Sequence, residues 1–169
     1  PPPAADAAPP ADDAVDAVYV ANTHNFHHHT VLLALQAGKH VLCEKPLTVN
    51  ARQAMECINA ASDRDLFLME AMWTRFLPAC RQLKAWMEEG RIGEVQQVSA
   101  GFGFNGSWPE DGRMLNRDLA GGCMLDMGIY PLSFVSMVAG GQAPVKIQSQ
   151  SVIGKTGVDI DGTYLLTYP

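Results

Sequence analysis

The fold is decided by residues 16–48, which read DAVYVANTHNFHHHTVLLALQAGKHVLCEKPLT. Two short runs rich in β-branched side chains, Asp16–Ala21 and His40–Glu44, predict buried strands. Between them, the apolar spacing from Thr30 onward predicts a helix, and Gly38 is a typical helix terminator. Two strands joined by one helix through short connections form a βαβ unit, so the sequence predicts a parallel sheet.

The alternation of strands and helices continues downstream to Gly90. Asn50 predicts the cap of a helix that runs from Ala51 to about Asp63. Residues 66–71 predict a third strand, and residues 76–89 predict a helix that tolerates Pro78 in its first turn.

The pattern changes after Gly93. The stretch Glu94–Phe104 alternates apolar and polar residues, which predicts a strand with one solvated face. A polar loop extends to Arg117 and precedes an apolar helix predicted over Gly121–Val138. Two further strands are predicted, at 145–152 and 163–168. We therefore expect a disordered segment at 1–10, a partial dinucleotide-binding domain at 11–90 and a partial substrate or dimerisation domain at 91–169.

The composition is that of a globular protein. Of the 169 residues, 47% are hydrophobic and 18% are charged. The net charge of -6 argues against a nucleic-acid partner, because phosphates require cationic side chains. No apolar run approaches the roughly 20 residues of a spanning helix, so no membrane partner is expected. The first ten residues, PPPAADAAPP, cannot bury enough apolar area to order themselves and predict disorder.

The four cysteines predict neither a disulfide framework nor a zinc site. They are far apart and never form a C-x-x-C pair: Cys43, Cys57, Cys80 and Cys123. Unpaired cysteines in apolar segments suit a reducing compartment, so we expect a cytoplasmic protein.

Four segments resemble signatures of the Gfo/Idh/MocA family of nicotinamide-dependent oxidoreductases. They are AGKHVLCEKPLT at 37–48, EAMWTRFLP at 70–78, RIGEV at 91–95 and AGGCMLDMGIYP at 120–131. The last two segments, with a tyrosine at position 130, resemble most the family branch that contains dimeric dihydrodiol dehydrogenase and D-xylose 1-dehydrogenase. The resemblance implies an α/β chain: the C-terminal part of a parallel, doubly wound Rossmann domain, then a truncated α+β domain with an open, mostly antiparallel sheet.

The resemblance also implies a preceding βαβ unit with a G-x-G-x-x-G loop, and this unit is not found where it would be expected. We therefore expect a fragment of a longer protein that does not bind NADP tightly by itself. Residues 101–106, GFGFNG, satisfy the same pattern. No helix is predicted to open there, so this stretch is interpreted as a strand end and loop.

Lys45 and Tyr130 are the strongest catalytic candidates. Lys45 follows a buried parallel strand and emerges where open α/β sheets bind ligands, and Pro46 restricts its backbone to extended geometry. The resemblance implies that Lys45 hydrogen-bonds the reacting hydroxyl and that Tyr130 is the acid/base. Asp126 lies four residues before Tyr130, hence on the same helix face, and is expected to position the substrate or the tyrosine. The alternative is a buried structural tyrosine bonded to Asp126.

Further residues are predicted to line the cofactor or the substrate. The turn after the first strand is expected to line the nicotinamide pocket, together with residues around Lys45 and in the EAMWTRFLP segment: Asn22, Thr23, His24, His27, Glu44, Lys45, Pro46, Trp73 and Arg75. Arg113 and Arg117 could contact substrate hydroxyls, although solvated loop arginines are the alternative. Neighbouring histidines on a helix point about 100° apart, so the run 27–29 predicts no metal site.

The sequence thus predicts an oxidoreductase that uses NADP, or NAD, to transfer a hydride to or from a polyol, sugar or cyclic diol. The resemblance implies a homodimer when the protein is full length. Two alternatives remain open. One is a non-catalytic fragment or degenerate paralogue that acts as a binding or oligomerisation module. The other is a different reaction of the same family, such as lactone-forming sugar oxidation instead of carbonyl reduction.

Overall fold

The computed structural model describes residues 12–169, so the predicted disordered segment 1–10 lies outside the described residues. The chain divides between Ala71 and Met72 into two compact units, each of which is described by itself. The sequence placed this boundary near Gly90. The difference arises because Trp73 and Arg75 hydrogen-bond to a helix of the second unit.

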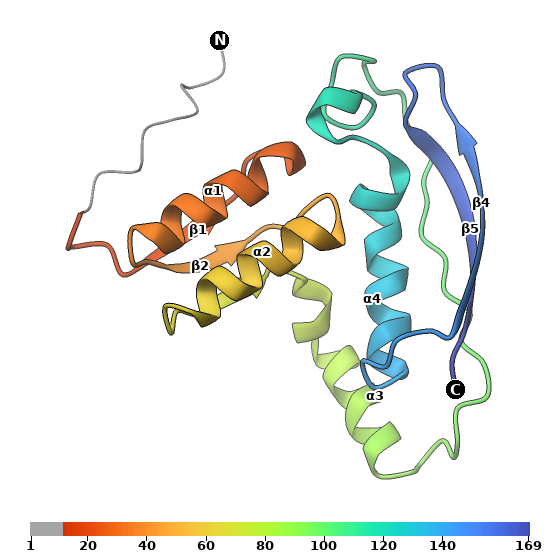
Figure 1. Cartoon of the computed structure of the whole chain (residues 1–169). Helices are drawn as coiled ribbons and strands as arrows, with labels where there is room; N and C mark the ends of the chain where they lie inside the picture. The colour runs from red at the N-terminus through yellow and green to blue at the C-terminus, as the bar shows by residue number, and fades with distance from the viewer. Residues whose placement is uncertain (1–11) are drawn as a thin grey trace. The chain divides into compact units, whose positions relative to one another are not determined.

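The first unit is a three-stranded parallel sheet with two helices, as the sequence predicted. The strands lie in the order β1-β2-β3, and every described pairing is parallel. The unit consists of β1 (Ala17–Val20), α1 (His24–Gln36), β2 (His40–Cys43), α2 (Ala51–Ser62) and β3 (Leu68–Glu70) (Figure 1). Asn50 caps α2 as predicted, because its Oδ1 accepts a hydrogen bond from the Gln53 N–H at 3.0 Å.

The core of this unit lies between the sheet and the two helices. Alternate strand residues point toward α1 and α2, and the helices contribute small and branched side chains. The buried set is Val20, Val31, Ala34, Leu35, Val41, Cys43, Cys57 and Ala61.

Helix α1 begins at His24, six residues earlier than the sequence predicted. The prediction of a turn carrying His24 and His27 is therefore wrong. The two imidazoles are buried and occupy helix positions three residues apart, on the face that Val31 and Leu35 continue. Histidines stand at positions where apolar residues usually mark such a face, so the helical period was hidden.

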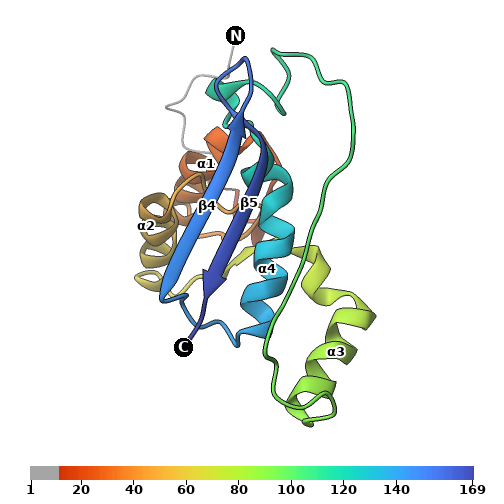
Figure 2. The same cartoon turned by 90° about the vertical axis from the view of Figure 1, so that its right-hand side faces the viewer.

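The second unit combines helices with one antiparallel hairpin. It contains a 3₁₀ turn (Trp73–Phe76), α3 (Pro78–Glu88), α4 (Ile129–Val138), β4 (Lys146–Ile153) and β5 (Asp159–Thr167). The hairpin lies beside α4 in both views (Figures 1 and 2). The predicted strands near the C-terminus are confirmed, with β5 beginning four residues earlier than expected.

The predicted strand Glu94–Phe104 is not a strand. Within residues 12–169 it forms no ladder with another strand, and in Figure 2 it runs as a long green segment without regular structure. Alternating polarity shows which side chains could share a face, but a strand also needs a neighbouring backbone to bond with. The GFGFNG stretch at 101–106 overlaps the end of this segment and opens no helix, as predicted.

The apolar helix predicted over Gly121–Val138 has two parts. Its first part, Met124–Gly128, is π-helical, and α4 follows directly. The helical run Arg117–Val138 is 22 residues long and contains an 18-residue window with a mean hydropathy of 1.2. By length and composition alone it could cross a membrane, which the sequence analysis did not expect. Core helices of soluble proteins share both properties, so they do not identify a spanning helix.

The hairpin is attached to the start of the π-helical segment Met124–Gly128 through Asp159. The Asp159 Oδ2 accepts a hydrogen bond from the Met124 N–H at 2.6 Å. Gly122 makes room for this contact: its φ is +122°, and a Cβ there would lie 2.3 Å from the Asp159 Oδ1. Only glycine combines this backbone conformation with so close an approach.

The cysteines differ in burial, which predicts a difference in reactivity. All four are unbridged, and burial raises the pKa of Cys43 to about 12 and that of Cys57 to about 11. The thiolate is the reactive species, so a raised pKa lowers reactivity at pH 8. Iodoacetamide at pH 8, followed by peptide mass spectrometry, should label Cys80 and leave Cys43 and Cys57 unmodified. Labelling in urea is the control and should modify all four. Rapid native labelling of Cys43 would contradict this burial.

Candidate active site

The loop that carries Lys45 follows β2, the central strand of the parallel sheet (Figure 1). It is held from two sides. The His27 Nδ1 lies 2.7 Å from the Pro46 carbonyl oxygen, and the Leu47 N–H donates to the Glu70 Oε1 at 2.7 Å. The peptide bond between Lys45 and Pro46 is cis. These contacts, from α1 and from the end of β3, fix the backbone on which the ammonium stands.

The predicted nicotinamide-lining residues of segment 22–27 lie at the same edge of the sheet. Asn22 and Thr23 follow β1, and the carboxyl ends of parallel strands meet at one edge. The His27 Nε2 lies 3.1 Å from the Asn22 carbonyl oxygen, so His27 links this turn to the Lys45 loop. His24 packs edge-on against His27, with ring centroids 5.7 Å apart.

Glu44 orients the backbone beside Lys45. Its Oε2 accepts a hydrogen bond from the Lys45 N–H at 3.2 Å, and its Oε1 accepts one from the Tyr19 hydroxyl. The bond to Glu44 raises the pKa of the Tyr19 phenol. Glu44, which the sequence places among the residues lining the cofactor pocket, thus contacts the backbone of the Lys45 loop directly.

In the second unit, Tyr130 lies in the first turn of α4 and on the wall of a cavity of about 600 Å³. Its hydroxyl oxygen accepts a hydrogen bond from the Trp73 Nε1–H at 3.1 Å. Two rings meet the phenol edge-on, Trp73 at 6.0 Å and Phe102 at 5.5 Å between centroids. The remaining wall is mostly apolar and includes Leu77, Pro131, Phe134 and Met137. A ring-shaped, largely apolar molecule would suit such a space.

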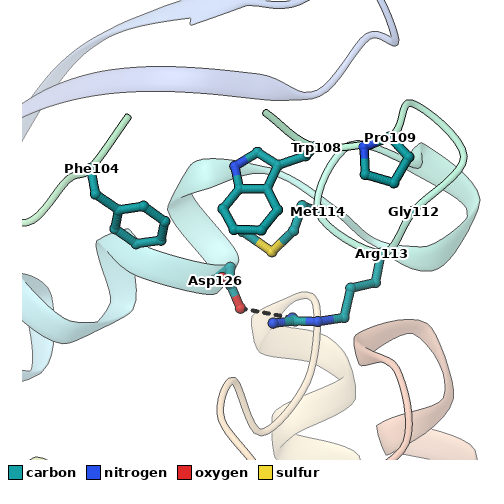
Figure 3. Close-up of a pocket in the computed structure, with 7 residues that line it drawn as sticks. All are labelled: Phe104, Trp108, Pro109, Gly112, Arg113, Met114 and Asp126. Carbon is teal, nitrogen blue, oxygen red and sulfur yellow. Dashed lines mark hydrogen bonds and ion pairs between the residues drawn. The ribbon is translucent and has the colours of Figure 1, made fainter. Parts of the chain in front are cut away.

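Asp126 lines a different cavity, of about 290 Å³, together with Phe104, Trp108 and Met114 (Figure 3). The Arg113 Nη1 donates to the Asp126 Oδ1 at 3.0 Å, so Arg113 is paired with a carboxylate and is not simply solvated. The four-residue spacing predicted one shared helix face for Asp126 and Tyr130. That spacing assumes an α-helical period, whereas Asp126 lies in the π-helical segment, where the period is longer.

The other predicted residues take different positions. Arg117 begins a 3₁₀ turn next to Gly157 of the hairpin and lines neither of the two cavities. Arg75, predicted near the cofactor, donates to Ser133 on α4. Sequence reasoning missed Ser133, Phe102 and Trp108. The only signal for the aromatic residues was their grouping in a glycine-rich loop.

The donor set suits the nicotinamide end of a dinucleotide. The sheet edge carries side-chain amide, hydroxyl and ammonium groups, from Asn22, Thr23 and Lys45. Two of them already donate hydrogen bonds to side chains of α1, the Asn22 amide to Thr30 and the Thr23 hydroxyl to Asn25. Within residues 12–169, the only G-x-G-x-x-G sequence lies in the irregular segment described above, which has no helix N-terminus to receive phosphate. No group of three or more potential metal ligands occurs among the described residues.

Comparison with known proteins places the chain in a family. The model described as "Oxidoreductase family, NAD-binding Rossmann fold" matches residues 5–72, and the "GFO/IDH/MocA C-terminal domain" model matches residues 80–169. The chain belongs to the Gfo/Idh/MocA family. It is thus an oxidoreductase-family chain with NAD(P)-binding Rossmann structure, as the sequence predicted. The first matched range ends one residue past the boundary between the units, and the second range lies wholly within the second unit.

Several Gfo/Idh/MocA relatives are similar over almost the whole chain. Trans-1,2-dihydrobenzene-1,2-diol dehydrogenase from Homo sapiens is 46% identical over 161 residues, and that from Macaca fascicularis is 45% identical over 158. Each alignment covers 94% of this chain and 47% of the relative. The chain therefore spans about half the length of the curated relatives it matches.

Solved structures of the same family share the fold. A variant of the 3-ketoreductase KijD10 from Actinomadura kijaniata, in complex with TDP-benzene and NADP, superposes with a TM-score of 0.82 at 34% identity. The alignment covers 92% of this chain and 48% of that one. An aldose-aldose oxidoreductase from Caulobacter crescentus, complexed with glycerol, has a TM-score of 0.79 at 25% identity, with the same coverage.

Proposed function

We propose that this chain supplies the reacting half of an NADP-dependent dehydrogenase that acts on a secondary alcohol of a cyclic diol or sugar. The observation that carries the proposal is Tyr130, whose hydroxyl oxygen is held by the Trp73 indole at the wall of a mostly apolar cavity. A phenol in this setting can exchange a proton with a bound hydroxyl while the remainder of the ring substrate occupies the cavity.

The oxidation removes a hydride from the alcohol carbon and a proton from its oxygen. Nicotinamide, when bound, accepts the hydride from carbon. Tyr130 takes the hydroxyl proton as general base, and Lys45 hydrogen-bonds the same oxygen and favours the deprotonated phenol by its charge. Asp126 orients the substrate from the neighbouring cavity, where Arg113 holds its carboxylate.

The solved 3-ketoreductase supports this assignment of Lys45 and Tyr130. Its structures with NADP and TDP-benzene include one with a tyrosine replaced by phenylalanine and one with a lysine replaced by alanine. The separation of those two residues in that sequence is within one position of the separation between Lys45 and Tyr130 here.

The relatives and the cavity favour a cyclic diol over an open polyol. The aligned relatives carry the name trans-1,2-dihydrobenzene-1,2-diol dehydrogenase, and an aromatic wall of Trp73 and Phe102 suits a flat apolar ring. An arginine–carboxylate pair beside Trp108 would also accept sugar hydroxyls, so a sugar is the second candidate. NADP is the proposed cofactor, with NAD as the alternative, and the cytoplasm is the proposed compartment.

Self-association is proposed for the intact protein. Every residue of β4 is exposed, and this strand carries the apolar side chains Ile147, Val152 and Ile153. A second copy that covers this sheet would bury on the order of 1,600 Å² in a stable dimer.

The test is NADPH formation, followed at 340 nm, in a protein that carries these residues within a complete dinucleotide-binding domain. We expect turnover with trans-cyclohexane-1,2-diol or D-xylose and none with cyclohexane, which has no hydroxyl. If NADP binds but neither alcohol is oxidised, the non-catalytic binding module becomes the better description.

A further inference from the structure

We propose that Arg75 is a positioning residue for Tyr130 and that it acts through Trp73 and helix α4. This inference deepens the proposed function and rests on the assignment of Tyr130 as the proton-transferring group. In this role Trp73 bonds to the Tyr130 hydroxyl and Arg75 holds Trp73 in place, whereas the sequence predicted that both residues lie near the cofactor.

Arg75 holds the 3₁₀ turn against α4 through two hydrogen bonds to Ser133. The Arg75 Nε donates to the Ser133 Oγ at 2.9 Å, and the Arg75 Nη2 donates to the Ser133 carbonyl oxygen at 3.0 Å. Ser133 lies three residues after Tyr130, so both stand on the same face of α4. The turn is therefore attached to the helix at two points, through Arg75 to Ser133 and through Trp73 to Tyr130.

The bond from Trp73 restricts the direction of the Tyr130 hydroxyl proton. The indole Nε1–H is a donor only, so its 3.1 Å bond occupies a lone pair of the Tyr130 oxygen. The hydroxyl proton of Tyr130 must then point away from Trp73. With the ring held edge-on by Phe102, the indole restricts the directions in which the proton can be delivered.

The bond from Trp73 also stabilises the negative charge that develops on the Tyr130 oxygen during proton transfer. When Tyr130 loses its proton, the bond from Trp73 remains and becomes charge-assisted, which makes it roughly twice as strong as a neutral bond. Trp73 thus contributes more to the deprotonated state than to the resting one, which is the condition for lowering a barrier.

The orientation of Trp73 depends on the guanidinium of Arg75. Trp73 is 54% exposed, so its own packing does not determine its orientation. The guanidinium is planar, and two bonds from one plane fix the angle of the turn as well as its distance from α4. A lysine could form one of these bonds but could not fix that angle.

Hydrogen exchange of the three tryptophan indole protons in the 169-residue chain, measured by ¹⁵N NMR, tests the positioning without any need for activity. Tyr130→Phe removes the acceptor, and Arg75→Lys removes the two-point attachment without touching Trp73. We expect each to speed exchange of the Trp73 indole at least about fivefold while Trp86 and Trp108 stay within a factor of about two. Unchanged Trp73 exchange in Arg75→Lys, or equal acceleration at all three indoles, would overturn the positioning role.

Kinetics in the protein with a complete dinucleotide-binding domain supply the second readout. Trp73→Phe keeps an aromatic ring and deletes the N–H, and Ser133→Ala deletes one of the two Arg75 bonds. We expect kcat to fall about tenfold in Trp73→Phe and less in Ser133→Ala, with KM changed less than about threefold in both. A rise in KM at constant kcat would show that Trp73 binds substrate only, and would overturn the proposal. If the parent protein is inactive while the NMR result holds, it is the proposed function that fails.

Discussion

Replacing Tyr130 with phenylalanine is expected to lower turnover by about 10²-fold or more, in a protein that carries these residues within a complete dinucleotide-binding domain. The substitution removes one oxygen and leaves the ring that packs against Trp73 and Phe102. Positioned proton transfer contributes about 10²–10⁴-fold to a rate, so the loss should fall in kcat. Steady-state kinetics with NADP at saturation measure it.

Lys45→Met is expected to have an effect of similar size, because it removes the ammonium and retains a side chain of similar length. The backbone contacts of the loop do not involve the ammonium, so the fold should survive. Cofactor affinity, followed by fluorescence, should change much less than turnover.

Tyr19→Phe is the matched control for Tyr130→Phe. It likewise removes a phenol oxygen, one that bonds to Glu44, and it should retain most activity. Near-normal turnover in Tyr130→Phe would make the tyrosine structural and the assigned chemistry wrong.

Replacing Gly122 with alanine is expected to destabilise the second unit by about 2–4 kcal/mol. The new Cβ would lie 2.3 Å from the Asp159 Oδ1, so either the carboxylate or the backbone must move. Moving the carboxylate breaks its bond to the Met124 N–H at the start of the π-helical segment. The change should appear in urea unfolding monitored by circular dichroism.

Gly140→Ala is the matched control for this experiment. Gly140 also has a positive φ, of 66°, but nothing lies within 4 Å of the point that an alanine Cβ would occupy there. The variant should therefore lose only the backbone strain of a left-handed alanine, about 1 kcal/mol. Equal losses of stability in the two variants would mean that the contact with Asp159 contributes nothing.

Local patterns were sufficient for most of the first unit. The β-branched runs around Val20 and Val41 are separated by one helix, and this favours parallel pairing because the helix returns the chain to the end of the sheet at which the first strand began. Asn50 caps α2 through its own side chain, and such local hydrogen bonds depend only on nearby residues. Helix α1 was misplaced because its buried face contains His24 and His27, whose polarity hides the period.

The positions of the candidate site residues could be predicted only in part. The sequence singled out Lys45 and Tyr130 through segments that resemble a family, and it placed Lys45 correctly at the end of a parallel strand. It could not predict that Arg113 pairs with Asp126, because that pairing depends on how a loop folds back onto a helix. The π-helical segment likewise changes which residues share a face with Tyr130.

The sequence by itself determined the order of strands and helices in the first unit, its parallel sheet and the residue types available for proton transfer, because these follow from local periodicity and side-chain chemistry. Only the tertiary structure decided that Glu94–Phe104 is not a strand, that Asp159 requires Gly122, and that Arg75 and Trp73 bond to α4. Each of these depends on atoms far apart in the chain coming within hydrogen-bonding or van der Waals distance, which no local pattern encodes.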